Sequence, residues 1–277
     1  MKKAIAKIIL LLLAVCCDVW LTAYVRRQAS VYQPFDESCM ERVIKNQEIL
    51  PDTVKLLQGY AAETDMTYEE WLWAYLYTGS DDRQVIEHTW ERLWNRYPEE
   101  IQQQTEYLRA IWSDLVYFPV PASSLDADKQ VAFENSWMQS RTYGGNRGHE
   151  GTDIMASVNS RGVYPIISVS DGVVEKMGWL PQGGYRIGVR SEHGAYFYYA
   201  HLSDYAEGLK VGDRVHAGDL LAFMGDTGYS EVEGTTGNFD VHLHFGVYLN
   251  DAAGNEFAVN SYAVLQYLEE SKLQYPY

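Results

Sequence analysis

Two histidines separated by a single residue constrain the C-terminal half of this chain. His242 and His244 lie in a run, Phe239 to Leu249, that has the composition of a β-strand. Because side chains alternate between the two faces of a strand, both imidazoles leave the same face. One ring can then bind a metal ion while its neighbour faces the same space. The sequence predicts a sheet with a site on one of its faces.

Three further residues complete the pattern: His149 and Asp153, with Gly151 between them, and His201. Gly148 and Gly151 disfavour a helix here, so His149 and Asp153 are expected on an irregular or turning segment. The aromatic run Gly194 to Leu202 predicts a strand with His201 at its end. Two imidazoles and one carboxylate fill three corners of a tetrahedral zinc site and leave the fourth for water. This donor set predicts a hydrolytic zinc site.

The remaining histidines, His88, His193 and His216, occur singly. A lone histidine is more often a surface or hydrogen-bonded core residue than a ligand. We expect the first in a helix and the other two in polar turns, none of them in the site.

Short β-type runs between residues 144 and 246 are separated by glycine-containing turns. This spacing predicts several antiparallel strands joined by tight turns. A groove across one face of such a sheet suits an extended peptide. Tyr143, Trp179 and Tyr229 are candidates for its walls, although an aromatic side chain in a β protein is more often part of the core than a substrate contact.

Five segments stand in the order and register of one known family: Gly148 to Asp153, Ser170 to Val174, Tyr199 to Leu202, Val211 to Gly218 with Gly225 to Gly228, and His242 to Phe245. From about Tyr143 to Leu249 the chain resembles the LytM/lysostaphin family of zinc endopeptidases, which cut peptidoglycan cross-bridges. The resemblance implies an α+β fold with an antiparallel sheet of the duplicated-hybrid-motif type. It also implies that zinc is bound by three residues, His149, Asp153 and His244. The catalytic histidines would be His201 and His242.

Two positions depart from the family pattern. The segment Tyr229 to Val241 lengthens the connection into the H-x-H strand, which predicts a longer loop beside the groove. Gly246 stands where the family commonly has Glu, so a hydrogen bond to a zinc-binding ring is expected to be missing or supplied elsewhere. Neither departure removes a zinc ligand. Upstream of the ligands, Asn146 is a candidate to cover the metal or to bind substrate.

The protonation chemistry of a zinc site predicts a role for each of the two remaining histidines. Bound zinc lowers the pKa of water from about 15.7 to about 7, which provides a nucleophile at neutral pH. His242 would accept the water proton and pass it to the leaving amine. His201 would hold or orient the developing oxyanion.

Three other functions compete with this one. The segment Val211 to Leu221 also resembles a biotinyl or lipoyl carrier hairpin, but no lysine occurs between Lys210 and Lys272 to carry the group. A zinc D-Ala-D-Ala carboxypeptidase would need a different spacing and a Trp-His element. An exported zinc-containing scaffold or regulator shares the fold, yet it would need neither His201 nor His242.

The N-terminus predicts export. Lys2, Lys3 and Lys7 precede an apolar run from Ile8 to Val25, which is interrupted by Asp18 and followed by two arginines. Its length and flanking charge favour an uncleaved membrane anchor over residues 1–30 with the rest of the chain outside the cytoplasm. A signal peptide that is cleaved, giving a secreted protein, is the alternative.

Residues 31–117 are expected to form a helical domain and residues 118–277 the zinc peptidase domain. Helix starts are predicted at Thr67, by a capping box, and at Pro98, with a stop near Gly79. Five aromatics are expected to build the helical core: Trp71, Trp73, Tyr75, Trp90 and Trp94. Phe118 to Pro121 is interpreted as a linker, and Asn260 to Lys272 as a closing helix on the sheet edge.

Charge and cysteine content restrict the partners. Residues 1–30 contribute 5 basic and 1 acidic residue, which leaves 17 basic and 37 acidic residues, a balance of −20, in the exported part. Such a surface argues against nucleic acid and anionic membranes as partners. The expected partners are peptidoglycan peptides and, through the N-terminal helix, a membrane. Cys39 is the single cysteine outside the apolar run, so no intrachain disulfide is expected.

Overall fold

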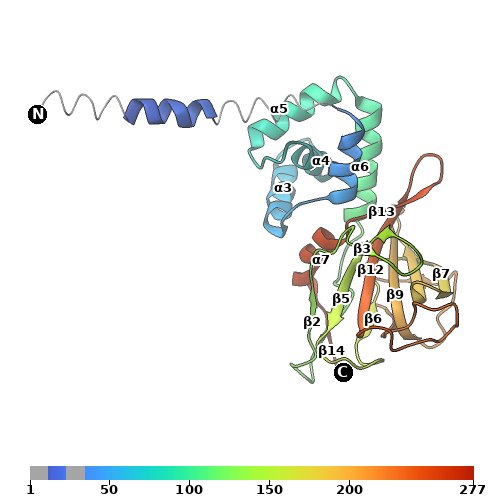
Figure 1. Ribbon diagram of the computed structural model, residues 1–277. Helices are drawn as coiled ribbons and strands as arrows, with labels where there is room; N and C mark the ends of the chain where they lie inside the picture. Colours follow the sequence, from blue (N-terminus) through green and yellow to red (C-terminus); the bar gives the residue numbers. More distant parts are fainter. Residues whose placement is uncertain (1–11, 23–34) are drawn as a thin grey trace, which may run out of the picture.

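The computed structural model describes residues 12–22 and 35–277, in which a helical layer precedes a large sheet (Figure 1). A helix covers 12–22. The helices that follow are α2 (Glu37–Cys39), the π-helix η1 (Met40–Asn46), α3 (Pro51–Glu63), α4 (Tyr68–Thr78), α5 (Arg83–Trp94), α6 (Pro98–Trp112), α7 (Tyr262–Leu268) and the 3₁₀ helix η2 (Glu269–Ser271). The strands are β1 (Ala122–Ser123), β2 (Val131–Phe133), β3 (Ser140–Arg141), β4 (Arg147–Gly148), β5 (Thr152–Ala156), β6 (Pro165–Ile167), β7 (Gly172–Leu180), β8 (Gly184–Arg190), β9 (Tyr196–Tyr205), β10 (Arg214–Val215), β11 (Leu220–Met224), β12 (His242–Asn250), β13 (Glu256–Val259) and β14 (Gln274–Tyr275).

The principal sheet has ten strands with the backbone order β10-β7-β8-β9-β12-β5-β2. Its pairings are antiparallel, as the turn spacing predicts. β11 pairs with both β6 and β9, and β13 pairs with β12. β12 therefore lies in the middle of the sheet, with β9 on one side and β5 on the other. The H-x-H pair is carried by a central strand, whose backbone is fixed by hydrogen bonds on both sides.

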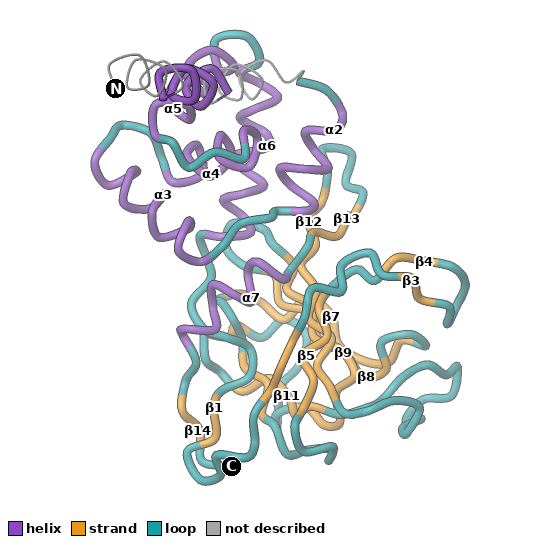
Figure 2. The backbone as a smooth tube through the Cα atoms, turned by 60° about the vertical axis from the view of Figure 1, so that its left-hand side comes forward, coloured by secondary structure: helices purple, strands orange, loops and turns teal. Residues whose placement is uncertain are grey.

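The helical layer forms as its local signals predict. Thr67 caps α4 with a capping box to Glu70, Gly79 ends this helix in the left-handed region, and Pro98 begins α6. Of the five predicted core aromatics, Trp71, Trp73 and Trp90 are buried, whereas Tyr75 and Trp94 are partly buried against the same core. The helices gather at one end of the molecule and the strands at the other (Figure 2).

The segment predicted to be a linker is packed into the protein. Phe118 and Val120 are buried in the core, and the peptide N–H of Ile167 donates to the carbonyl of Pro119. Phe118 to Pro121 connects α6 to β1, but it is packed against the core and not exposed. Its two prolines favour an extended backbone. Its two apolar side chains are stabilised by burial, which an exposed connection would not provide.

The closing helix is shorter than predicted: α7 ends at Leu268 and η2 continues it to Ser271. It lies between the helical layer and the sheet, where Lys55 of α3 pairs with Glu270. Helices from the N-terminal and the C-terminal parts of the chain therefore contact one another beside the sheet.

The predicted anchor extends beyond the described residues on both sides. Within the ranges 12–22 and 35–277, no helix has both the length and the apolar character needed to span a bilayer. The anchor stays a prediction.

Candidate active site

Three predicted ligands converge on one point. His149 Nε2 lies 2.9 Å from His244 Nδ1 and 3.0 Å from Asp153 Oδ1, and the last two atoms are 3.1 Å apart. Among the described residues this is the group of His, Cys, Asp or Glu side chains that could hold a metal ion. Ligand atoms 2.0–2.1 Å from a tetrahedral zinc would lie about 3.3 Å from one another. The observed separations fit a small cation after slight spreading.

The position of the proton on His149 also favours a cation at this point. His149 Nδ1 lies 3.2 Å from the carbonyl oxygen of Ser136, which can only accept, so this nitrogen carries the proton. The Nε2 lone pair then points at His244 Nδ1 and the Asp153 carboxylate. Three electron-pair donors directed at one point are stabilised by a cation between them. The residues present fit zinc.

Strand register brings the ligands together. Asp153 in β5 is directly opposite His244 in β12, and Ala200 of β9 is opposite His244 on its other side. Side chains of directly opposite residues are about 5 Å apart, within reach of a shared ion. His149 lies outside the sheet, on the irregular segment between β4 and β5, as its glycines predict.

Gly151 has a steric role that the sequence interpretation missed. A Cβ at this position would lie 2.6 Å from both Cε1 and Nε2 of His244 and 2.7 Å from the carbonyl oxygen of Phe245. Its glycine identity is therefore set by the close approach of a ligand ring and not only by the turn. The segment that carries His149 passes directly against the imidazole of His244.

His242 lies beside the ligand cluster without joining it. Its Nε2 is 3.8 Å from Asp153 Oδ1, and its ring leaves the same face of β12 as His244. Its Nδ1 is 2.7 Å from the carbonyl oxygen of Asp240, so Nδ1 carries a proton and donates it. In the neutral ring, Nε2 is then an acceptor facing the metal site.

His201 is held at a bulge in β9. The strand continues to Tyr205, so the prediction that it ends at His201 is wrong. Between the pairs Tyr185–Leu202 and Ile187–Tyr199, β9 has one residue more than β8, and His201 adopts a left-handed φ of 62°. Bulges re-aim side chains near functional sites, and a left-handed conformation in a residue other than glycine is a mark of such sites.

The hydrogen bonds of His201 revise its expected role. Nδ1 lies 2.8 Å from the carbonyl oxygen of Thr227 and must donate to it. Burial, followed by the positive potential of His242 and His244, holds the pKa of His201 well below its ordinary value. A neutral ring with a protonated Nδ1 presents an acceptor at Nε2. It can hold or receive a proton there, but it cannot donate to an oxyanion without first being charged.

The ligands themselves are electrostatically coupled. Burial alone would raise the pKa of Asp153, but the adjacent imidazoles of His149 and His244 outweigh it and hold this pKa well below its usual range. Burial lowers the pKa of His244, against the opposing effect of Asp153. The ionised carboxylate and neutral imidazole that result are the protonation states in which these groups bind metals.

Two residues that support the ligands were not predicted. Arg141 Nη2 lies 2.9 Å from Asp153 Oδ2, the oxygen turned away from the cluster, and Ser136 Oγ lies 2.9 Å from His149 Nδ1. Both precede the recognisable motif and come from the segment around β3. No spacing in the sequence marks them, because the hairpin of β3 and β4 brings them to the site.

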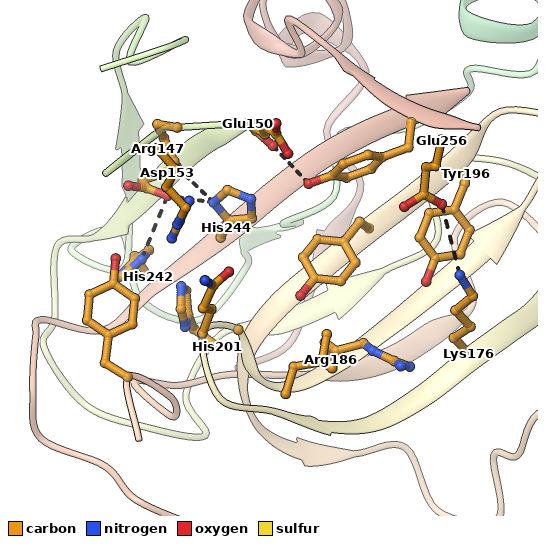
Figure 3. A pocket seen from close by; sticks show the side chains of 17 residues that line it. Arg147, Glu150, Asp153, Lys176, Arg186, Tyr196, His201, His242, His244 and Glu256 are labelled. Carbon is orange, nitrogen blue, oxygen red and sulfur yellow. Dashed lines mark hydrogen bonds and ion pairs between the residues drawn. The ribbon is translucent and has the colours of Figure 1, made fainter. Parts of the chain in front are cut away.

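The site opens into a groove of about 440 Å³. Figure 3 shows His201, His242 and His244 at one end and Lys176 with Glu256 at the other. Tyr229 lines it and Tyr143 stacks on Tyr229 with ring centroids 4.7 Å apart, so the long loop does lie beside the groove.

Two of the candidate residues lie outside the groove wall. Trp179 packs edge-on against Tyr185 and is not among the residues that line the groove. Asn146 is exposed and is likewise not part of the groove wall. The bend at Gly144 and Gly145, both with positive φ, lies between Tyr143 and Asn146.

The three single histidines lie away from the ligand cluster, as expected. His88 is in α5, His193 pairs with Asp114, and His216 contacts Asp171 in an exposed turn.

Comparison with known proteins identifies a family for the part of the chain that carries the candidate site. Residues 147–256 match the profile of Peptidase family M23. The L-Ala–D-Glu endopeptidase of Bacillus subtilis is 37% identical over 157 residues, which cover 57% of this chain and 45% of that protein. The glycyl-glycine endopeptidase ALE-1 of Staphylococcus capitis is 36% identical over 114 residues, covering 40% and 27%. This chain thus spans less than half the length of these curated relatives.

A solved structure matches more of the chain. The crystal structure of a lytM protein from Ruminococcus gnavus is 37% identical, has a TM-score of 0.70, and is covered over 95% of its length by 89% of this chain. That share exceeds what residues 118–277 alone would supply, so the likeness includes helices of the N-terminal layer.

Proposed function

Because this chain belongs to peptidase family M23, we propose that it is a zinc metallo-endopeptidase that hydrolyses peptide bonds of bacterial peptidoglycan. The observation that carries the proposal is the convergence of His149, Asp153 and His244 beside two further imidazoles with free acceptor nitrogens. The two similar endopeptidases are named for L-Ala–D-Glu and glycyl-glycine bonds. Both names describe peptides of the cell wall, which supports this substrate class.

Bound zinc supplies a Lewis acid that makes water a nucleophile near neutral pH and polarises the scissile carbonyl. His149, Asp153 and His244 hold the ion. Their protonation states need no change for this, since Asp153 is ionised and His149 presents its Nε2 lone pair.

His242 is the general base of the proposed reaction. Its Nε2 accepts the proton of the attacking water, because Nδ1 is already committed to the carbonyl of Asp240. The same nitrogen then returns the proton to the leaving amine. His201 presents a second acceptor at Nε2, with ring centroids 4.7 Å from His242, and orients the water through its other hydrogen.

The proposed location is the outer face of a membrane, through an anchor within residues 1–30, with secretion after cleavage as the alternative. The lysine-flanked apolar run supports the anchor. The division into residues 1–30, 31–117 and 118–277 is part of the same proposal.

The activity is tested with the full chain and purified sacculi. We expect new free amino groups to appear when zinc is present and their release to stop after chelation, because metal and nucleophile are lost together. Mass spectrometry of the released fragments identifies the bond that is cut. Absence of chelator-sensitive release from sacculi of several cross-link types would refute the proposal.

Arg141→Gln is expected to weaken zinc affinity about tenfold to a hundredfold, because residues that orient a ligand commonly contribute that much. The variant loses the 2.9 Å ion pair to Asp153 while keeping a polar side chain. Competition with a chromophoric chelator measures the affinity.

Ser136→Ala is the matched control for this measurement. It removes the hydroxyl near His149 Nδ1 but leaves the carbonyl of the same residue as acceptor, so zinc affinity should change little. Equal zinc affinity in Arg141→Gln and the unaltered protein would show that the ion pair does not position Asp153.

A further inference from the structure

The groove contains two arginines that have no carboxylate partner among the described residues. Arg147 and Arg186, here called the groove arginines, both line it, and neither forms an ion pair with a carboxylate of the described chain. Other cations nearby are paired: Arg190 with Glu175, and Lys176 with Glu256 at 3.9 Å. The chain has 38 acidic residues against 22 basic ones, so carboxylates are not scarce. The lack of a carboxylate partner for these two guanidinium groups, within the described part of the chain, therefore needs an explanation.

Both groove arginines also carry a buried donor without an acceptor. Arg186 Nη1 and Arg147 Nε are shielded from solvent and have no hydrogen-bond partner in the structure. Buried polar groups are nearly always satisfied, and a charged donor left without an acceptor is especially unfavourable. An acceptor supplied by a ligand would satisfy them.

Tyr198 connects the groove arginines to the metal site. Its ring lies edge-on to His244, with centroids 5.9 Å apart. Like Arg147 and Arg186, it lines the groove. Figure 3 shows Arg147 beside Asp153 and Arg186 across the groove from it. An extended peptide advances about 3.3–3.6 Å per residue, so a group one or two residues from the scissile bond reaches this position.

The acidic groups around the groove do not neutralise this position. Asp153 is a zinc ligand that is already paired with Arg141, and Glu256 faces Lys176. Glu150 is exposed, and its carbonyl oxygen accepts from the hydroxyl of Tyr248. What remains available in the groove wall is the pair of guanidinium groups and the phenol of Tyr198, a donor set suited to a carboxylate.

We propose that Arg186, assisted by Arg147 and Tyr198, binds a free carboxylate of the substrate peptide one or two residues from the scissile bond. The proposal rests on the proposed peptidase function and specifies its substrate class. It predicts a preference for anionic stem-type peptides over uncharged glycine bridges. Arg186 is a specificity-determining residue in this scheme, because it contacts substrate without taking part in proton transfer.

The test compares three peptides with the full, zinc-loaded chain. Two are stem-type L-alanyl-D-glutamyl peptides that continue through the side-chain carboxyl and differ only in a free α-carboxylate or its carboxamide, and the third is pentaglycine. We expect the carboxylate form to have a kcat/KM about ten- to a hundredfold above the carboxamide form. Arg186→Gln should remove this difference by lowering the kcat/KM of the carboxylate form to that of the carboxamide form.

A binding measurement separates the two proposals. In a His242→Gln background, which slows turnover, calorimetry should show the same carboxylate preference, lost again on Arg186→Gln. Arg214→Gln is the charge-matched control, since Arg214 is exposed on β10 and outside the groove. Preferential binding without hydrolysis of any peptide would refute the peptidase and retain the carboxylate site. Equal handling of the carboxylate and carboxamide forms, or a uniform loss in Arg186→Gln, would overturn the carboxylate site while hydrolysis stands.

Discussion

Replacing His244 with alanine is expected to remove zinc and peptide hydrolysis together. The side chain supplies one of three converging ligand atoms, 2.9 Å from His149 Nε2 and 3.1 Å from Asp153 Oδ1. With one imidazole gone, two ligands remain on a site that needs three. Zinc content by elemental analysis and release of amino groups from sacculi should fall in parallel. The melting temperature should also lose its dependence on added zinc.

His242→Ala provides the contrast that gives this result its meaning. The residue lies two positions away on the same face of β12, so it has a similar environment, but it is not among the three ligands. Zinc should stay bound while the rate falls about 10²- to 10⁴-fold, which is the usual contribution of a general base. Full zinc content and full cleavage in His244→Ala would disprove the ligand assignment. Loss of zinc in His242→Ala would move that residue into the ligand set.

The ligand set could be predicted because it depends on short-range geometry. A period of two in a strand decides that His242 and His244 share a face, whatever the rest of the fold does. The pairing of Asp153 with His244 follows once β5 and β12 are neighbours. Helix starts at Thr67 and Pro98 were predictable for the same reason, since a cap is a contact between residues three apart.

The features that could not be predicted depend on how distant segments meet. His201 is aimed at the site by one extra residue in β9 relative to β8, and a bulge leaves no mark in composition. Arg141 reaches Asp153 from β3, and Arg186 reaches the groove from β8, at spacings that no motif fixes. The two prolines beside Phe118 predict a connecting segment, whereas the burial of its ring depends on contacts with distant parts of the core.

Gly151→Ala is the second substitution from which we expect a large effect. The added methyl group would lie 2.6 Å from the His244 ring and 2.7 Å from the carbonyl oxygen of Phe245, closer than real Cβ atoms approach other atoms. One contact is with backbone, so the clash is relieved mainly by moving the ligand ring or the segment that carries His149. Either movement spreads the ligand atoms. We expect loss of most bound zinc and of activity, with a cost in stability of about 1–3 kcal/mol from overpacking.

Two glycine controls separate the metal effect from general destabilisation. Gly172→Ala also creates a backbone clash, at 2.5 Å from the carbonyl oxygen of Arg190, but that position is not among the residues lining the groove. It should lower the melting temperature without changing zinc stoichiometry. Gly59→Ala, inside α3 with open space around its Cβ, should be neutral or stabilising by up to about 1 kcal/mol. If Gly151→Ala behaved like Gly172→Ala, with a lower melting temperature and a full complement of zinc, then the ring of His244 would have to yield without losing the metal. The close approach of Gly151 would then be a packing feature and not a determinant of the site.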